Sequence, residues 1–275
     1  MKIGIWIYAL ATVVTGILNI VWGALEPTHQ PIQSLGKHVP GAQILAYIAG
    51  AWLIAAGLAF LWRRTERMGA AASAIIYLVF ALLWLPRFWT ATHVLGFRLG
   101  VVVFILFGIG QQLLLMSPAV IVYALRTSLN KTRALTAARW LLGLGPVVFG
   151  LGHLIGWKVM AGFVPHWVPF PVFWAILTGI VFLLSGISIL SGIYDVLAVR
   201  LLALMLFLFE VIVEAPPVFA QPHSQTAWGG AVYNITAIGA CLIFSEFVMS
   251  RRNARHEKTG VTTNIASAQP DSLIA

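Results

Sequence analysis

The chain has 275 residues, of which 60% are hydrophobic and only 9% are charged, and its formal net charge at pH 7 is +9. A soluble domain of this size carries about 25% charged residues, so the composition excludes a water-soluble globular protein. The single cysteine, Cys241, excludes an intrachain disulfide and a CxxC redox motif.

Eight apolar segments are long enough to cross a bilayer, which takes about 20 residues of helix. We therefore predict an all-α fold, a polytopic transmembrane bundle of eight helices. The segments are Ile3–Leu25, Gly41–Trp62, Gly69–Leu85, Leu99–Met116, Trp140–Trp157, Phe170–Tyr194, Val196–Val213 and Ala227–Val248.

Prolines are expected to end two of these helices and to kink or end a third. Pro86 is expected to stop the third helix, and Pro216 with Pro217 the seventh. Pro118 follows the fourth segment, and it either kinks that helix, which then continues to Leu125, or ends it.

The basic residues gather in alternate loops. With the N-terminus in the cytoplasm, thirteen lie inside and four outside. The inner set is Lys2, Arg63, Arg64, Arg67, Arg126, Lys131, Arg133, Arg139, Arg200, Arg251, Arg252, Arg255 and Lys258, and the outer set is Lys37, Arg87, Arg98 and Lys158. Cytoplasmic loops are enriched in Lys and Arg, which predicts a bacterial-type inner membrane protein with both termini cytoplasmic. The lipid bilayer, and no nucleic acid, then accounts for the positive charge.

The two halves of the chain resemble each other. At an offset of 129 residues, matches include Gly16 with Gly145, Gly23 with Gly152, Pro40 with Pro169, Gly50 with Gly179 and Gly57 with Gly186; at 130 they are Pro86 with Pro216, His93 with His223 and Gly100 with Gly230. This pattern predicts two parallel four-helix repeats related by an axis along the membrane normal. The predicted units are residues 1–125 and 140–250, with a cytoplasmic linker at 126–139 and a disordered cytoplasmic tail at 251–275.

Motifs in the second half resemble the DoxX-like family of small four-helix membrane proteins, over Ala138 to Phe247. The motifs are Phe149-Gly-Leu-Gly-His153, Val164-Pro-His-Trp-Val-Pro-Phe-Pro171, Thr178-Gly179, Gly186-Ile-Ser-Ile-Leu-Ser-Gly192, Arg200-Leu-Leu-Ala-Leu-Met205 and Pro216 to His223. Some members of this family are subunits of thiosulfate:quinone oxidoreductases, and others accompany redox enzymes. The resemblance therefore implies a quinone as cofactor and a redox protein as partner. Members often carry a polar residue where His153 stands, and the offset of 129 places Ala24 at that position in the first half.

Three residues are the candidates for a functional site. Glu210 lies inside the seventh helix, and Glu214 follows one turn later on the same face. Intramembrane acids usually face a bundle interior or a water-filled path, which indicates a proton-linked site or a contact with a quinone head group. The alternative is that Glu214 lies at the outer interface and Glu210 bonds a neighbouring helix. His153 is a candidate proton relay, quinone contact or metal ligand, or else an ordinary interhelical hydrogen-bond donor.

The remaining polar residues predict structure rather than chemistry. The outer histidines His29, His38, His93, His166 and His223 show no spacing typical of a metal site, and we predict no metal. Asp195 and Arg200 are expected to pair across the short turn between helices six and seven. Asn19, Gln111, Gln112 and Asn234 are expected to form interhelical hydrogen bonds.

Three functions are consistent with the sequence. The first is an accessory or membrane subunit of a quinone-linked redox system. The second is a proton-coupled small-molecule transporter that uses Glu210. The third is a structural or assembly protein without catalysis. Whether the protein is an enzyme is left open.

Overall fold

The structure is a computed structural model that describes residues 1–26 and 41–267, with side chains as far as Ala254. All regular elements in these residues are helical, and eight segments are long and apolar enough to cross a membrane. The chain is therefore an integral, multi-pass membrane protein, and the predicted all-α transmembrane bundle is confirmed. The elements are α1 (Lys2–Trp22), α3 (Ala42–Leu61), α4 (Glu66–Leu83), α5 (Arg87–Leu95), α6 (Leu99–Leu125), α7 (Lys131–Ile155), α8 (Trp157–Ala161), α9 (Pro171–Ser191), α10 (Asp195–Phe209), the π-helix η1 (Glu210–Glu214), α11 (Ala215–Ala220) and α12 (Gln225–Ser267).

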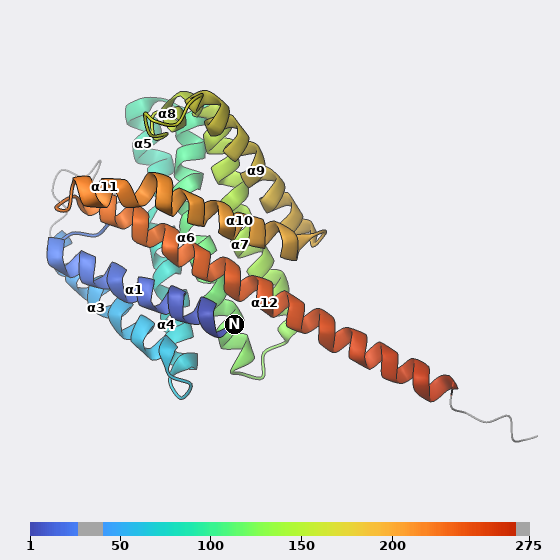
Figure 1. The fold of residues 1–275 in the computed structure, drawn as a ribbon. Coiled ribbons are helices and arrows are strands. Elements are labelled where there is room, and N and C mark those ends of the chain that lie inside the picture. Colours follow the sequence, from blue (N-terminus) through green and yellow to red (C-terminus); the bar gives the residue numbers. More distant parts are fainter. Residues whose placement is uncertain (27–40, 268–275) are drawn as a thin grey trace, which may run out of the picture.

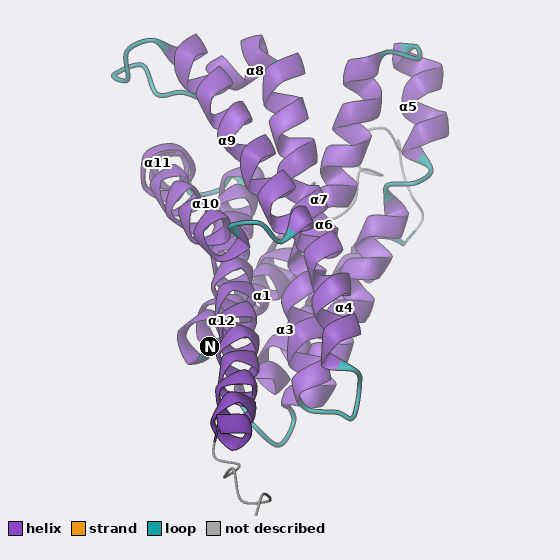
Figure 2. Cartoon of the chain, turned by 90° about the vertical axis from the view of Figure 1, so that its right-hand side faces the viewer, coloured by secondary structure: helices purple, strands orange, loops and turns teal. Residues whose placement is uncertain are grey.

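The spanning helices form a closed ring in which each packs against its neighbours in sequence and α12 packs against α1. Helix α6 also contacts α12 across the ring. Figures 1 and 2 show the loops after α3 and α6 at the same end as the N-terminus, with α5 and α8 at the opposite end. We call these the inner and the outer end.

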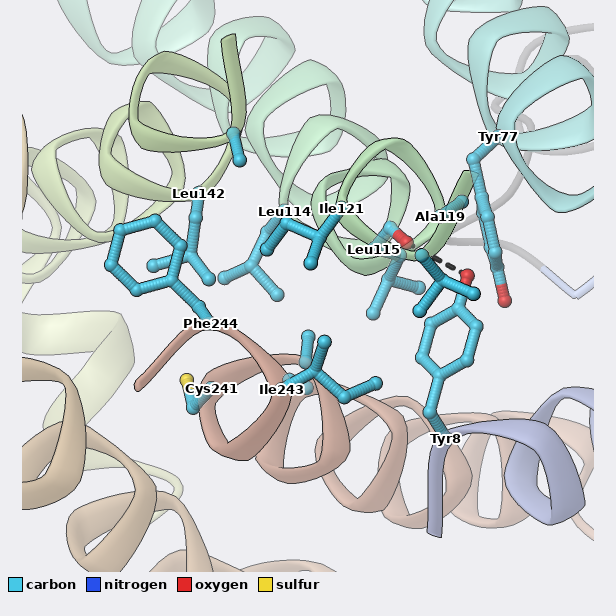
Figure 3. Packing of buried hydrophobic residues seen from close by; sticks show 14 of the residues in the cluster. Tyr8, Tyr77, Leu114, Leu115, Ala119, Ile121, Leu142, Cys241, Ile243 and Phe244 are labelled. Carbon is cyan, nitrogen blue, oxygen red and sulfur yellow. Dashed lines mark hydrogen bonds between the residues drawn. The ribbon is translucent and has the colours of Figure 1, made fainter. Parts of the chain in front are cut away.

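The core lies where α6 and α12 meet the helices beside them. Figure 3 shows Tyr8 of α1, Tyr77 of α4, Leu114 of α6, Leu142 of α7 and Phe244 of α12 around this centre, and all five are at most 1% exposed. Burial against α6 and α12 thus joins helices from both halves of the chain.

Two helix pairs approach closely because glycines face each other. A Cβ atom on Gly16 of α1 would lie 2.5 Å from the carbonyl oxygen of Gly50 in α3, and one on Gly150 of α7 would lie 2.7 Å from that of Gly179 in α9. Gly150, and not the predicted Gly145, therefore has the place in α7 that Gly16 has in α1. The offset of 129 is wrong for this helix, because matches between glycines in an apolar chain do not identify which face of a helix they occupy.

The helix ends predicted near prolines have different outcomes. Helix α6 continues through Pro118 to Leu125, which answers the question left open by the sequence. The third helix stops before Pro86 as predicted, because α4 ends at Leu83 and Pro86 takes the N-cap position of the short helix α5. The seventh span differs from the prediction, because it includes Pro216 and Pro217 in the first turn of α11.

The predicted linker and tail are also partly helical. Helix α7 begins at Lys131, inside the predicted linker 126–139, because the Asn130 side chain accepts hydrogen bonds from the amides of Thr132 and Arg133. Helix α12 continues through the predicted disordered tail as far as Ser267. Extending an existing helix costs little, since nucleation has already occurred, and no proline interrupts these residues.

Candidate functional site

The two candidate acids lie in a π-helical turn. The five residues from Glu210 to Glu214 form η1, and the amide of Ala215 donates to the carbonyl of Glu210, five residues back. Pro216 has no N–H to donate, and in a regular helix its ring would clash with the carbonyl of Ile212. The wider π-turn relieves this conflict, and such turns are frequent at functional sites.

Asn234 of α12 holds this turn in place. Its side-chain Nδ2 donates to the carbonyl oxygen of Leu206 at 2.6 Å and to Oε2 of Glu210 at 3.3 Å. Asn234 is 5% exposed, so these bonds are made inside the bundle. The interhelical hydrogen bond predicted for Asn234 is confirmed, and Glu210 faces the neighbouring helix rather than lipid.

The carboxylate of Glu214 lies against Gly230 of α12, in space that a Cβ atom at that position would occupy. The next residue back, Gly229, is covered by the side chain of Glu26, which is 1% exposed. Successive glycines of α12 thus make room for two acids from different parts of the chain. Glu26 was not among the predicted site residues, because it follows the first apolar segment and resembles an ordinary loop acid.

Asn19 of α1 supports Glu26. Its Oδ1 accepts a hydrogen bond from the backbone amide of Glu26 at 3.1 Å. This bond is local and does not join two helices as predicted. The side chain of Gln225 also donates to the carbonyl of Ala24 at 2.8 Å and ties the start of α12 to the end of α1.

His153 lies on α7, beside α9. Its Nδ1 donates to the carbonyl of Phe149 at 2.8 Å, so in the neutral imidazole Nε2 is an acceptor. A Cβ atom on Gly179 would lie 2.9 Å from Cβ of His153, and one on Gly50 would lie 3.4 Å from Cβ of Asn19. Asn19, and not Ala24, is therefore the first-half residue in the place of His153.

An aromatic cluster separates His153 from Glu210. The ring of His153 lies 5.2 Å from that of Phe182, which lies 5.5 Å from Phe149 and 6.1 Å from Phe209, the residue before Glu210. The three predicted site residues are therefore not one contact group. His153 contacts this cluster through Phe182, whereas Glu210 follows Phe209 in the chain and Glu214 lies one turn beyond.

Two of the five outer histidines, His29 and His38, lie outside the described residues. His93 stacks on Trp89 with 5.6 Å between ring centres, and the carbonyl of His223 accepts from the indole of Trp22. Among the described residues, no three His, Cys, Asp or Glu side chains are placed to hold a metal ion.

The predicted pair of Asp195 and Arg200 is wrong. Asp195 is fully buried and pairs with Arg139 of α7 and with Arg252 of α12, the latter at 2.6 Å, while Arg200 contacts the sulfur of Met249. Asp195 begins α10, so its carboxylate points back toward helices that are distant in the sequence.

Comparison with known proteins identified no related protein. No protein-family model, no curated protein and no solved structure matches the chain.

Proposed function

We propose that this membrane protein is a membrane subunit or accessory protein of a quinone-linked redox system. It consists of two fused DoxX-like units in a bacterial-type inner membrane, with both termini in the cytoplasm. The observation that carries the proposal is the aromatic cluster of Phe149, Phe182 and Phe209, in which the Phe182 ring contacts His153 and Phe209 directly precedes Glu210.

This arrangement suits a quinone, which has a flat apolar ring and two carbonyl oxygens that accept hydrogen bonds. The phenylalanine rings offer an apolar surface to the quinone, while Nε2 of His153 and the carboxylate of Glu210 are hydrogen-bonding groups beside it. Reduction of a quinone takes up two electrons, which the redox partner supplies, and two protons. His153 and Glu210 are the residues that would exchange those protons.

Ion pairs at the inner end support the two-unit architecture. Glu66 begins α4 and pairs at 2.5 Å with Arg126, which follows α6. Asp195 begins α10 and pairs with Arg252 near the inner end of the span formed by α12. In each half, an acid at the start of the third spanning helix therefore meets an arginine near the inner end of the fourth.

A proton-coupled transporter is the second candidate, and one observation favours it. Glu66, Asp195 and Glu246 each pair with a cation, whereas in the described part of the chain no Lys, Arg or His nitrogen lies within 4 Å of the carboxylates of Glu210 and Glu214. Intramembrane acids without a cationic partner are typical of proton-binding sites.

Quinone binding tests the proposal. The purified protein in lipid nanodiscs is titrated with a short-chain quinol, and binding is followed by quenching of tryptophan fluorescence. Loss of a hydrogen bond to an ionisable group costs about 1.5 kcal/mol, so His153→Ala and Glu210→Gln should each weaken binding about tenfold.

Glu246→Gln is the matched control, because it removes a carboxylate from the inner end of α12 that pairs with the amino group of Met1. It should leave quinol affinity unchanged. An absence of binding by the unmodified protein would overturn the quinone proposal. If Glu210→Gln then abolished proton-coupled uptake in proteoliposomes, the transporter would replace it; if it changed neither activity, a structural role would remain.

A further inference from the structure

Helix α1 carries a stripe of polar residues on its buried face. Tyr8, Thr12, Thr15 and Asn19 recur at intervals of three or four residues, so they lie on one side of the helix. Each is at most 5% exposed. A membrane helix whose polar face is buried presents that face to the interior of the ring and not to lipid.

Other helices add polar groups opposite this stripe. The hydroxyl of Tyr77 on α4 lies 3.4 Å from Oγ1 of Thr12, and the ring of Tyr77 lies 6.4 Å from that of Tyr8. The hydroxyl of Tyr8 donates to the carbonyl of Leu115 on α6 at 2.9 Å, as Figure 3 shows. Ser73, one turn before Tyr77 on the same face of α4, is fully buried.

Two polar atoms beside this region have no hydrogen-bond partner among the described residues. They are Nδ2 of Asn19 and the hydroxyl oxygen of Tyr233 on α12. Leaving such a group unsatisfied in a buried site costs about 1–3 kcal/mol. Buried groups of this kind are ordinarily satisfied by internal water. The hydroxyls of Thr12 and Thr15 donate to carbonyls of α1 and retain lone pairs that can accept from such water.

The stripe connects the inner part of α1 to the candidate site, since Tyr8 lies about 9 Å from the inner end of this helix. At a rise of 1.5 Å per residue, Tyr8 and Asn19 are about 16 Å apart, roughly half the thickness of the hydrocarbon layer. Beyond Asn19 the stripe meets Glu26, whose amide Asn19 binds and whose side chain covers Gly229. Glu214 lies against the next glycine, Gly230. The outer end of the stripe therefore reaches the acids of the site.

We propose that this face of α1 lines a chain of internal water molecules that carries protons from the aqueous phase at the inner end of α1, which begins about 9 Å before Tyr8, to the acids Glu26 and Glu214. This path would supply protons to the site of the proposed function. Its role in quinone reduction rests on that proposed function, whereas the presence of the water does not. The alternative is that no internal water contacts these hydroxyl groups and that their side chains serve only in the packing of the core.

Radiolytic labelling in water enriched in oxygen-18 tests for the water directly, without quinone. Hydroxyl radicals formed from internal water oxidise the side chains beside it even when these are buried. We expect Tyr8 and Tyr77 to be labelled at least threefold faster than Phe244, a fully buried ring in the apolar core. Ser73→Ala and Thr12→Val should lower this labelling at least twofold, whereas Ser185→Ala, which removes a buried hydroxyl from α9, should not.

Proton transfer is measured with a pH-sensitive dye while quinone in nanodiscs is reduced by electrons from an electrode, so that the two protons taken up by each quinone are the only change in the medium. Thr12→Val should slow proton uptake about tenfold and leave quinol affinity unchanged. Labelling of Tyr8 and Tyr77 no faster than that of Phe244 would overturn the path, whatever the quinone result. If Tyr8 and Tyr77 were labelled faster than Phe244 but the protein bound no quinol, the water path would be supported and the quinone-linked function would be contradicted.

Discussion

Asp195 shows how a single residue can join three helices of this protein. Its fully buried carboxylate binds the guanidinium groups of Arg139 and Arg252 and also accepts from the amide of Val196. Transfer of a carboxylate from water is costly, and here two arginines and a backbone donor offset that cost. Asp195 therefore stabilises the inner ends of α7, α10 and α12.

We predict that Asp195→Asn destabilises the protein by about 3 kcal/mol, because it leaves Arg139 partly buried without a charged partner. The measurement is an unfolding titration in detergent micelles. Arg200→Met is the matched control, since Arg200 is exposed and contacts only the sulfur of Met249, and it should change stability by less than about 0.5 kcal/mol. Equal effects of the two substitutions would contradict the pairing.

Asn234 is the corresponding residue at the outer end. Because Nδ2 bonds both Leu206 and Glu210, we predict that Asn234→Leu lowers stability by about 1 kcal/mol and also weakens quinol binding. Thermal unfolding and the quinol titration measure the two effects. A change in stability with no change in affinity would show that Asn234 holds only the helix and not the carboxylate.

Among the elements, the close crossing of α1 and α3 depends on glycine at specific positions. The Cβ atom of an alanine at position 16 would meet the backbone oxygen of Gly50, which cannot move aside without moving α3. Position 100 differs, because a Cβ atom on Gly100 meets nothing within 4 Å. These two glycines therefore separate the effect of packing from the effect of helix propensity.

Gly16→Ala should lower the free energy of unfolding by about 1–3 kcal/mol, the usual cost of overpacking a core. Gly100→Ala should raise it slightly, by up to about 1 kcal/mol, because alanine favours a helix over glycine. Thermal unfolding of both variants in the same detergent measures the difference. Similar melting temperatures for the two variants would show that α1 and α3 do not cross at Gly16.

For the whole molecule, an even number of spans places both ends of the membrane domain on one side. The loops around Arg64 and Ile193 lie at the inner end, whereas Phe97 and Phe163 belong to the outer loops. All four residues are exposed, and Cys241 is buried. Single cysteines at these positions can therefore report on the topology.

In a Cys241→Ser background, we expect a membrane-impermeant maleimide to label Phe97→Cys and Phe163→Cys in intact cells. It should label Arg64→Cys and Ile193→Cys only after permeabilisation, because Lys and Arg are enriched in cytoplasmic loops and we expect the basic loops on that side. The inverse pattern would reverse the orientation. Labelling of Arg64→Cys and Phe97→Cys from the same side would contradict the order of the spans.

The amino-acid sequence alone determined the fold class and the eight spans, because about 20 consecutive apolar residues satisfy their backbone in a bilayer only as a helix. It also indicated Glu210, Glu214 and His153 as candidate site residues, since polar side chains inside such segments are energetically costly and therefore few. It placed Asn234 in an interhelical bond, which the structure shows.

Only the tertiary structure decided which polar residues meet. Helices of this protein are apolar on nearly every side, because lipid and protein core are both apolar, so hydropathy does not indicate the rotation of a helix about its axis. That rotation sets Asp195 against Arg139 and not Arg200, and it covers Gly229 with Glu26. It also turns Tyr8 and Thr12 inward, where they form part of the polar stripe.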